Sequence, residues 1–241
     1  MKRLIAVLPL LPGIAVAKTG LAPHATQLTI SSSSMNQAVS IVLGLTLIAV
    51  IPGMLVAMTS FTRTIVVLSL LRHAIGMQDT PPNSVLVVLA AFLTLLSMSP
   101  TFDKLDQEVI TPVTQQRLAT PKALARGGDI MKEYMLSRVN ETDMVFVLEL
   151  SGKPLPDDAA SIGLAHVVPA FLLGELRRAF QIGFVIFLPF LLVDLIVSSV
   201  LMSMGMMMVP PVSIALPIKI LMFILMDGWT LVARAILSDG V

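Results

Sequence analysis

Apolar residues gather in four long runs, and most polar residues lie between them. The runs cover about residues 39–58, 85–99, 181–202 and 212–235. An α-helix needs roughly 20 apolar residues to cross a bilayer. The pattern therefore predicts an all-α, membrane-associated protein, with one hydrophobic helical hairpin in residues 39–99 and a second in residues 166–241.

These runs contain residues that hydrocarbon does not accommodate well. We expect prolines to interrupt or kink three of the helices, at Pro52, Pro189 and Pro217. The last two runs also contain charges, at Asp194, Lys219 and Asp227. A charge at the bilayer centre costs about 3 kcal/mol even on lenient scales. The helices therefore need protein or water beside these positions.

Residues 100–165 form a polar insertion between the two hairpins. Residues 101–165 hold ten of the 15 acidic residues and seven of the 16 basic residues. The stretch of about 121–138 is compatible with a helix, and a loop of this length without structure is unusual in a compact protein. We expect a helical extracytoplasmic domain that contacts other copies of the chain. A solvated loop is the alternative.

The N-terminus has the pattern of a secretory signal peptide. Met1-Lys2-Arg3 is a positive start, residues 4–16 are apolar, and Ala15-Val16-Ala17 fits a cleavage site. We expect cleavage after Ala17, which leaves residues 18–38 as an extracytoplasmic segment. An uncleaved, short membrane anchor is the alternative. The chain has no cysteine, so no disulfide holds the exported part together.

The distribution of basic residues predicts an orientation. The connection at about residues 59–84 contains Arg63, Arg72 and His73 against Asp79, and basic residues in short loops favour the cytoplasm. Residues 100–165 then lie outside. We expect Arg63 and Arg72 to anchor helix ends at a polar boundary.

Two further features follow from local sequence. The Thr80-Pro81-Pro82-Asn83 stretch predicts a break before the next helix. The orientation leaves Arg177 and Arg178 on the outer side, unless they are buried with Glu175.

Composition supports a membrane protein and argues against two other classes. Hydrophobic residues make up 56% of the chain, charged residues 13%, and the mean hydropathy is +0.90. A net charge of +1 without a basic run does not favour nucleic-acid binding. His24, His73 and His166 are scattered, and no cysteine nucleophile or phosphate-binding loop is present. We expect no enzymatic activity, no cofactor and no metal site.

Polar residues in the second hairpin suggest specific contacts. Glu175 and Arg178 are three residues apart and share a helical face. They form either an intrahelical pair or a link to a neighbouring subunit, for which we expect Glu175 to meet Lys219 of the next copy.

Other positions favour packing over chemistry. Asp194 is expected to be a structural partner of backbone and basic groups rather than a proton-sensitive group. Asp227 and Trp229 are expected to form a packing and hydrogen-bonding corner rather than a proton relay. The i, i+4, i+7 spacing of the three phenylalanines predicts one apolar face for core or subunit packing. These phenylalanines are Phe180, Phe184 and Phe187.

Methionines gather at residues 202–211, which read MSMGMMMVPP. Methionine is unbranched and flexible, so it most often fills gaps in a core. From these residues alone, ordinary helix packing or a buried turn is the favoured interpretation.

Two sequence blocks resemble a known family. Residues 63–100 and 167–229, and above all DLIVSSVLMSMGMMMVPP at 194–211, resemble the FliP family of flagellar type III export-gate proteins. Virulence secretion systems have close homologues of this family. The resemblance implies a channel in the bacterial inner membrane and flagellar basal body. It implies that five FliP copies assemble with FliQ and FliR, that FlhA and FlhB associate with them, and that unfolded flagellar proteins pass through.

The same resemblance implies roles for residues of the second hairpin. The methionines of the turn would form a pore gasket, with turn and hinge residues beside it and intersubunit polar contacts elsewhere. The gasket residues are Met204, Met206, Met207 and Met208. The turn and hinge residues are Gly205, Pro210, Pro211 and Pro189. The polar contacts are Glu175, Arg178, Lys219, Asp194 and Asp227.

An ion-coupled secondary transporter is the rival function. Broken helices with intramembrane charges are typical of such transporters. An internal inverted repeat would favour that function, and the sequence contains no visible one.

Overall fold

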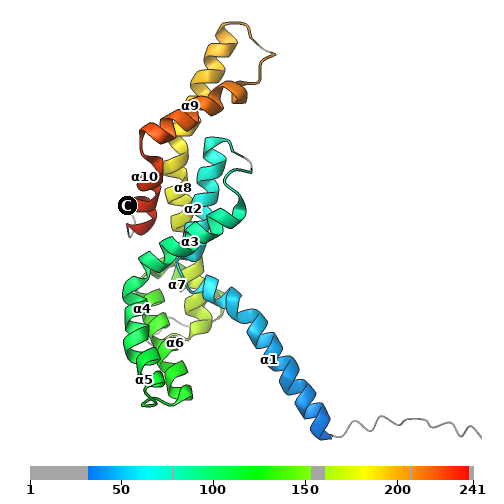
Figure 1. Cartoon of the computed structure of the whole chain (residues 1–241), viewed down its shortest axis with the longest axis vertical. Coiled ribbons are helices and arrows are strands. Elements are labelled where there is room, and N and C mark those ends of the chain that lie inside the picture. Colours follow the sequence, from blue (N-terminus) through cyan, green and yellow to red (C-terminus); the bar gives the residue numbers. More distant parts are fainter. Residues whose placement is uncertain (1–31, 78, 153–160, 207, 239–241) are drawn as a thin grey trace, which may run out of the picture. The chain divides into compact units, whose positions relative to one another are not determined.

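A computed structural model describes residues 32–77, 79–152, 161–206 and 208–238, and over these ranges the chain forms helices and no strand (Figure 1). This confirms the all-α class for the described residues. The expected signal peptide and its cleavage site lie outside them, as does most of the segment 18–38. The chain divides into two units, Met1–Thr46 and Leu47–Val241.

Helix α1, Ser32–Ala57, contains the first apolar run. The large apolar side chains of this helix whose exposure the structure describes include Ile41, Leu45 and Ile48, which are exposed. Pro52 lies inside the helix and does not end it.

The expected connection between the first two runs is itself largely helical. Helix α2, Phe61–Ile75, lies within it, and Val67, Leu68 and Leu71 of this helix are buried. Buried positions at this spacing make α2 a core element rather than a surface loop. Helix α3, Asn83–Ser97, begins at Asn83, as the Thr80–Asn83 break predicted.

The polar insertion is helical. It contains α4 (Ser99–Leu105), a π-helical stretch η1 (Asp106–Ile110), α5 (Thr111–Thr114), α6 (Thr120–Leu136) and α7 (Glu141–Leu150). The predicted helix at about 121–138 corresponds to α6, and a solvated loop is wrong for the described part. Met135 and Met144 pack in one cluster with Phe171 of the next helix, so the insertion shares its core with the second hairpin.

Helix α8, Leu164–Ser203, is 40 residues long and begins well before the predicted apolar run. Pro169 and Pro189 lie inside it, so Pro189 does not interrupt the helix. An interior proline removes one backbone hydrogen bond and so weakens a helix. Helix α8 packs against α2, α6, α7 and α9 (Pro211–Leu225), and these contacts offset that loss.

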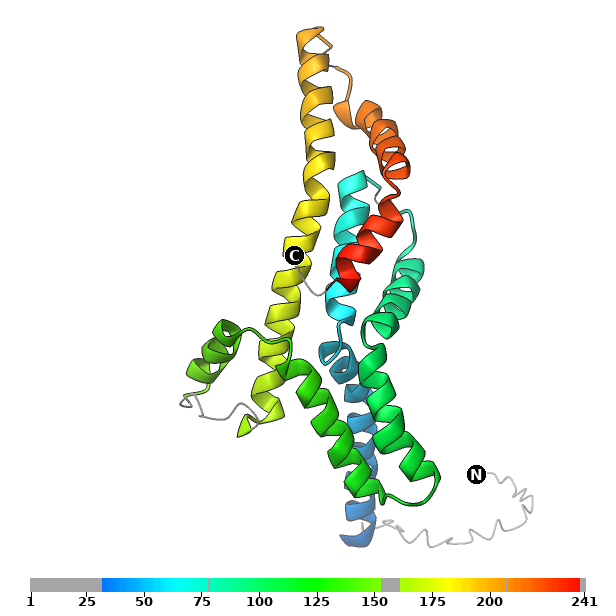
Figure 2. The same ribbon diagram turned by 90° about the vertical axis from the view of Figure 1, so that its left-hand side faces the viewer.

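The fourth run forms two helices instead of one. Helix α9, Pro211–Leu225, and helix α10, Gly228–Leu237, have axes 67° apart. Pro217 lies inside α9 without ending it. Figure 2 shows α9 folding back beside α8, with α10 continuing beside α2. The break therefore falls at Asp227 and not at the proline.

The largest apolar core lies among α2, α3, α8, α9 and α10, and its buried residues include Leu71, Ala90, Phe190 and Ile236. Among the described residues, two helical segments, Val39–Ala57 and Leu164–Ser203, are long and apolar enough to cross a membrane. The number rises to four if each of two bent helix pairs counts as one span.

Candidate functional site

The methionine-rich turn connects α8 to α9. Helix α8 ends at Ser203, where the amides of Gly205 and Met206 donate to the carbonyls of Met202 and Leu201, each at 3.0 Å. Gly205 has φ +72°, a left-handed conformation that glycine adopts without steric cost. The expected backbone role of Gly205 therefore has a geometric basis.

The methionines of the turn point away from the core of the chain. Met202 is 71% exposed, Met204 67%, Met206 39% and Met208 97%. Met207 lies outside the described residues. A buried turn, the interpretation that the residues alone favoured, does not fit this exposure.

The two prolines open the next helix rather than stopping the first one. Pro211 is the first residue of α9, a position that needs no backbone N–H donor. Figures 1 and 2 place the turn at the end of α8 that lies far from α4–α7.

A buried polar cluster joins α2 to the first half of α8, far along this helix from the methionine-rich turn. Arg63 and Glu175 are 0% and 1% exposed, and Arg63 Nε lies 3.2 Å from Glu175 Oε2. Arg178 Nη1 lies 3.1 Å from Glu175 Oε1, which is the expected intrahelical pair. Arg63 is thus a buried ion-pair partner and not an anchor at an exposed boundary, so that expectation was wrong.

The same part of α8 contacts the polar insertion. Arg177 Nη2 lies 2.6 Å from Oδ1 of Asp143, a buried residue of α7. Arg178 Nη2 donates to the carbonyl of Arg138, just after α6. Residues 175–178 therefore connect α8 to α2, to α7 and to the end of α6.

Tyr134 of α6 lies beside this cluster. Its ring packs against Phe171, with centroids 5.8 Å apart, and the Arg138 guanidinium lies 5.0 Å from its centroid. Burial raises the pKa of the Tyr134 hydroxyl above its ordinary value, while Arg138 and the Ser60 hydroxyl act in the opposite direction.

Lys219 of α9 forms a second polar cluster. Its Nζ donates to Asp194 Oδ2 at 2.6 Å and to the Ala74 carbonyl at 3.1 Å. Asp194 is thus placed as a structural partner of a basic group. Both Glu175 and Lys219 have partners within this chain, and a link between them across two copies remains a prediction.

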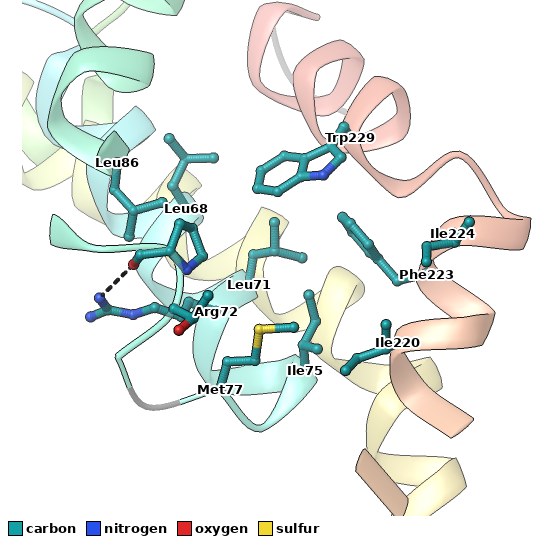
Figure 3. A pocket seen from close by; sticks show the side chains of 12 residues that line it. Leu68, Leu71, Arg72, Ile75, Met77, Leu86, Ile220, Phe223, Ile224 and Trp229 are labelled. Atoms are coloured by element: carbon teal, nitrogen blue, oxygen red, sulfur yellow. Dashed lines mark hydrogen bonds between the residues drawn. The ribbon is translucent and has the colours of Figure 1, made fainter. Parts of the chain in front are cut away.

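The corner between α9 and α10 packs as predicted. Asp227 adopts a left-handed backbone conformation, with φ 49° and ψ 53°. The rings of Phe223 and Trp229, on either side of it in the sequence, pack edge to face with their centroids 5.4 Å apart. Figure 3 shows both rings beside a pocket of about 210 Å³ that α2 residues also line. The Asp227 side chain has no hydrogen bond to another described residue. The packing part of the expectation is therefore met.

The phenylalanine face is only partly used within the chain. Phe187 packs against the largest apolar core, whereas the side chains of Phe180 and Phe184 are 60% and 64% exposed. No group of three or more potential metal ligands occurs among the residues that the structure describes.

Sequence reasoning missed the partners in these clusters. Each of the three ion pairs joins residues on two different helices. These pairs are Arg63–Glu175, Arg177–Asp143 and Lys219–Asp194. Local spacing contains no signal for them. For the Lys219–Asp194 pair the available hint was the presence of both charges within apolar runs, because such charges need partners.

Apolar helices with buried ion pairs and an inserted polar region define this chain as a helical membrane protein. The chain belongs to the FliP family, whose model matches residues 44–236. It is 47% identical to the flagellar biosynthetic protein FliP of Caulobacter vibrioides, over 81% of this chain and 73% of that protein. It is 43% identical to the Bacillus subtilis protein of the same name, over 86% of this chain and 93% of that one.

Proposed function

We propose that this chain is a core subunit of the flagellar type III export gate. Together with FliQ and FliR, five copies form the channel that passes unfolded flagellar proteins across the bacterial inner membrane, and FlhA and FlhB associate with it. Family membership supports this proposal, because the relatives are named flagellar biosynthetic proteins. The apolar helices support a location in the membrane.

The methionine-rich turn is the observation that best supports the role in the channel. Met204, Met206 and Met208 project from the tip of a helical hairpin, without burial in their own chain. Thioether side chains repack easily against surfaces of different shape. A ring of these turns from several copies would close the empty pore and would adapt to a passing chain. Met207 belongs to the same proposed gasket.

The exposed apolar residues of α8 support assembly into a complex. Phe180, Phe184 and Leu195 are each more than half exposed. Large exposed apolar surfaces mark contacts with proteins or with lipid. In the proposed gate, neighbouring subunits and membrane cover this surface, and residues 100–165 lie on the periplasmic side.

Polar contacts between subunits are part of the proposal. Asp227 is exposed at a helix corner and is free to meet a basic group of another subunit. A link from Glu175 to Lys219 of the next copy requires both residues to leave their partners in this chain. Pro189 would act as a hinge only if α8 bends there during opening. The secondary transporter has no support from the family comparison.

Cysteine cross-linking tests the position of the turn. The chain has no cysteine, so Met208→Cys introduces a single thiol. Membranes from cells that contain the whole export apparatus are oxidised, and linked copies are detected on a gel. We expect efficient linking for Met208→Cys and little for Leu225→Cys, an exposed position at the other end of α9. An assembled complex without Met208 cross-links would contradict a shared pore axis.

An ion-leak measurement tests the gasket itself. Replacement of Met204, Met206, Met207 and Met208 by glycine removes all four thioethers of the proposed gasket, and these positions lie between the end of α8 at Ser203 and the start of α9 at Pro211. We expect an assembled gate that leaks ions when idle. A glycine variant that assembles and stays ion-tight would reject the gasket.

A further inference from the structure

A cavity of about 270 Å³ lies beside the buried Arg63–Glu175 pair. Residues of α2, α8 and the end of α10 line it. Its polar lining residues are Arg63, Arg178 and Gln181, and its apolar ones are Ile182, Val185, Ile186 and Ala235. It is large enough for more than a single water, which occupies about 30 Å³ in the liquid.

Arg63 reaches this cavity with unused hydrogen-bond donors. Its side chain is 1% exposed, and Nε faces Glu175. Nη1 and Nη2 are buried and have no hydrogen-bond partner among the residues that the structure describes. A guanidinium has five N–H donors in a fixed plane, and buried donors of a charged group are strongly unfavourable without acceptors. These two nitrogens therefore need an acceptor in the working protein.

The charges around the cavity favour an anionic acceptor. Arg63 and Arg178 both pair with the single carboxylate of Glu175, so two positive groups of the cavity wall share one negative group. The second nitrogen of Arg178 is taken up by the Arg138 carbonyl. A guanidinium binds a carboxylate through two parallel hydrogen bonds, which matches the two unused nitrogens of Arg63.

We propose that this cavity receives the carboxylate of an acidic side chain from a neighbouring subunit of the gate. The carboxylate would bind Nη1 and Nη2 of Arg63, with Gln181 beside it. This inference rests on the proposed function, because it requires a neighbouring subunit. It assigns Arg63, which lies deep in its own chain, a second role at a subunit contact.

The surroundings of the cavity favour a protein partner over a lipid phosphate. Val185 lines the cavity and is 65% exposed, so the cavity meets the surface there. The adjacent residue Phe184 is 64% exposed and belongs to the uncovered phenylalanine face. A subunit that packs on this apolar face would bring a side chain directly to the cavity, with its backbone held by the surrounding contacts.

A carbodiimide cross-link tests the proposal in the whole complex. This reagent joins an amine to a carboxylate only when the two are in contact. Gln181→Lys places an amine at the cavity, and Arg178→Lys does so without a change of charge. The matched control is Leu192→Lys, an exposed position of the same helix that does not line the cavity. Mass spectrometry of the product identifies the acidic residue and its subunit.

The expected result is a product between subunits that is at least about tenfold more abundant for the two cavity variants than for the control. Arg63→Gln in the same background should reduce it by about tenfold, since loss of one partner of a buried charge pair weakens an interface at least that much. A product confined to Glu175 of the same chain would overturn the proposal. Anionic phospholipid that copurifies with the wild type but not with Arg63→Gln, without a cross-link between subunits, would overturn it in favour of lipid.

The outcome also separates this inference from the proposed function. If the wild-type chain does not copurify with FliQ and FliR, the proposed gate and this contact both fail. If the complex copurifies and exports flagellar proteins but forms no cross-link between subunits at the cavity, only the contact fails.

Discussion

Lys219 of α9 and Asp194 of α8 form an ion pair of 2.6 Å that joins the two arms of the second hairpin. Lys219 also donates to the Ala74 carbonyl of α2 at 3.1 Å, so one side chain connects three helices. The lysine side chain is 8% exposed and that of Asp194 38%. The aspartate thus provides the charge that a mostly buried ammonium needs, while it remains open to a neighbouring molecule.

We predict that Asp194→Asn destabilises the protein more than Lys219→Met does. The first change leaves a buried ammonium without its counter-charge, whereas the second removes the charge and retains an apolar chain of similar length. We expect a loss of about 2 kcal/mol for Asp194→Asn, because partial exposure lowers the cost of an unpaired lysine. Thermal unfolding in detergent measures both variants. The double variant should be more stable than the sum of the single effects predicts, and strict additivity would argue against the pair.

A second prediction contrasts buried and exposed ion pairs of the polar insertion. Asp143 is 3% exposed and pairs with Arg177 of α8, whereas Lys104 and Glu133 are 54% and 63% exposed. Asp143→Asn should cost about 1–3 kcal/mol, because it removes the charge that pairs with Arg177 and puts an NH2 donor in place of one oxygen of a buried carboxylate. Lys104→Ala should cost less than about 1 kcal/mol. Chemical unfolding compares the two variants, and equal effects would mean that Asp143 does not hold α7 on α8.

The helices with strong apolar patterns could be predicted from the sequence. The first, second and fourth runs correspond to α1, α3 and the α9–α10 pair, and the third lies in α8. Helix α2 was missed because its Arg63, Arg72 and His73 suggested a polar connection. In the fold, Glu175 supplies a counter-charge to the buried Arg63, and this partner lies more than a hundred positions away in the sequence.

The interruptions of the helices were harder to predict. Pro189 and Pro217 both lie inside helices, although an interior proline normally weakens a helix. The actual break is at Asp227, where the Asp-Gly dipeptide is a turn signal and where a packing corner was expected. The apolar run continues past this corner, so the pattern did not predict that one helix ends there and another begins. For the methionine turn, composition identified the segment, but its exposure depends on where the long helix α8 ends.

Gly228 provides a third prediction, at the break between α9 and α10. A Cβ atom at this position would overlap the ring of Phe223, and a flat aromatic ring in a core does not move easily. Gly228→Ala should therefore destabilise the protein by about 1–3 kcal/mol through overpacking. Gly128→Ala in α6 is the control, because no atom lies near its Cβ and alanine favours a helix. Thermal unfolding distinguishes the two, and a neutral Gly228→Ala would show that the corner rearranges.

Tyr134 provides a fourth prediction, on the response to alkaline pH. Burial raises the pKa of its hydroxyl above the ordinary value of 10.0, so the folded protein keeps the phenol proton to a higher pH than the unfolded chain does. Unfolding then releases this proton, and the free energy of unfolding should fall as the pH rises through the ordinary pKa of tyrosine.

The chain contains a single tyrosine, so the absorbance of the phenolate reports on Tyr134 alone. We expect a titration midpoint above 10.0 in the folded protein and a return to the ordinary value after unfolding. Tyr134→Phe should lose less stability than the wild type between neutral and strongly alkaline pH, because the variant has no proton to release. A folded-state midpoint at or below the ordinary value would mean that water reaches this hydroxyl, and that the core shared by α6 and α8 is open there.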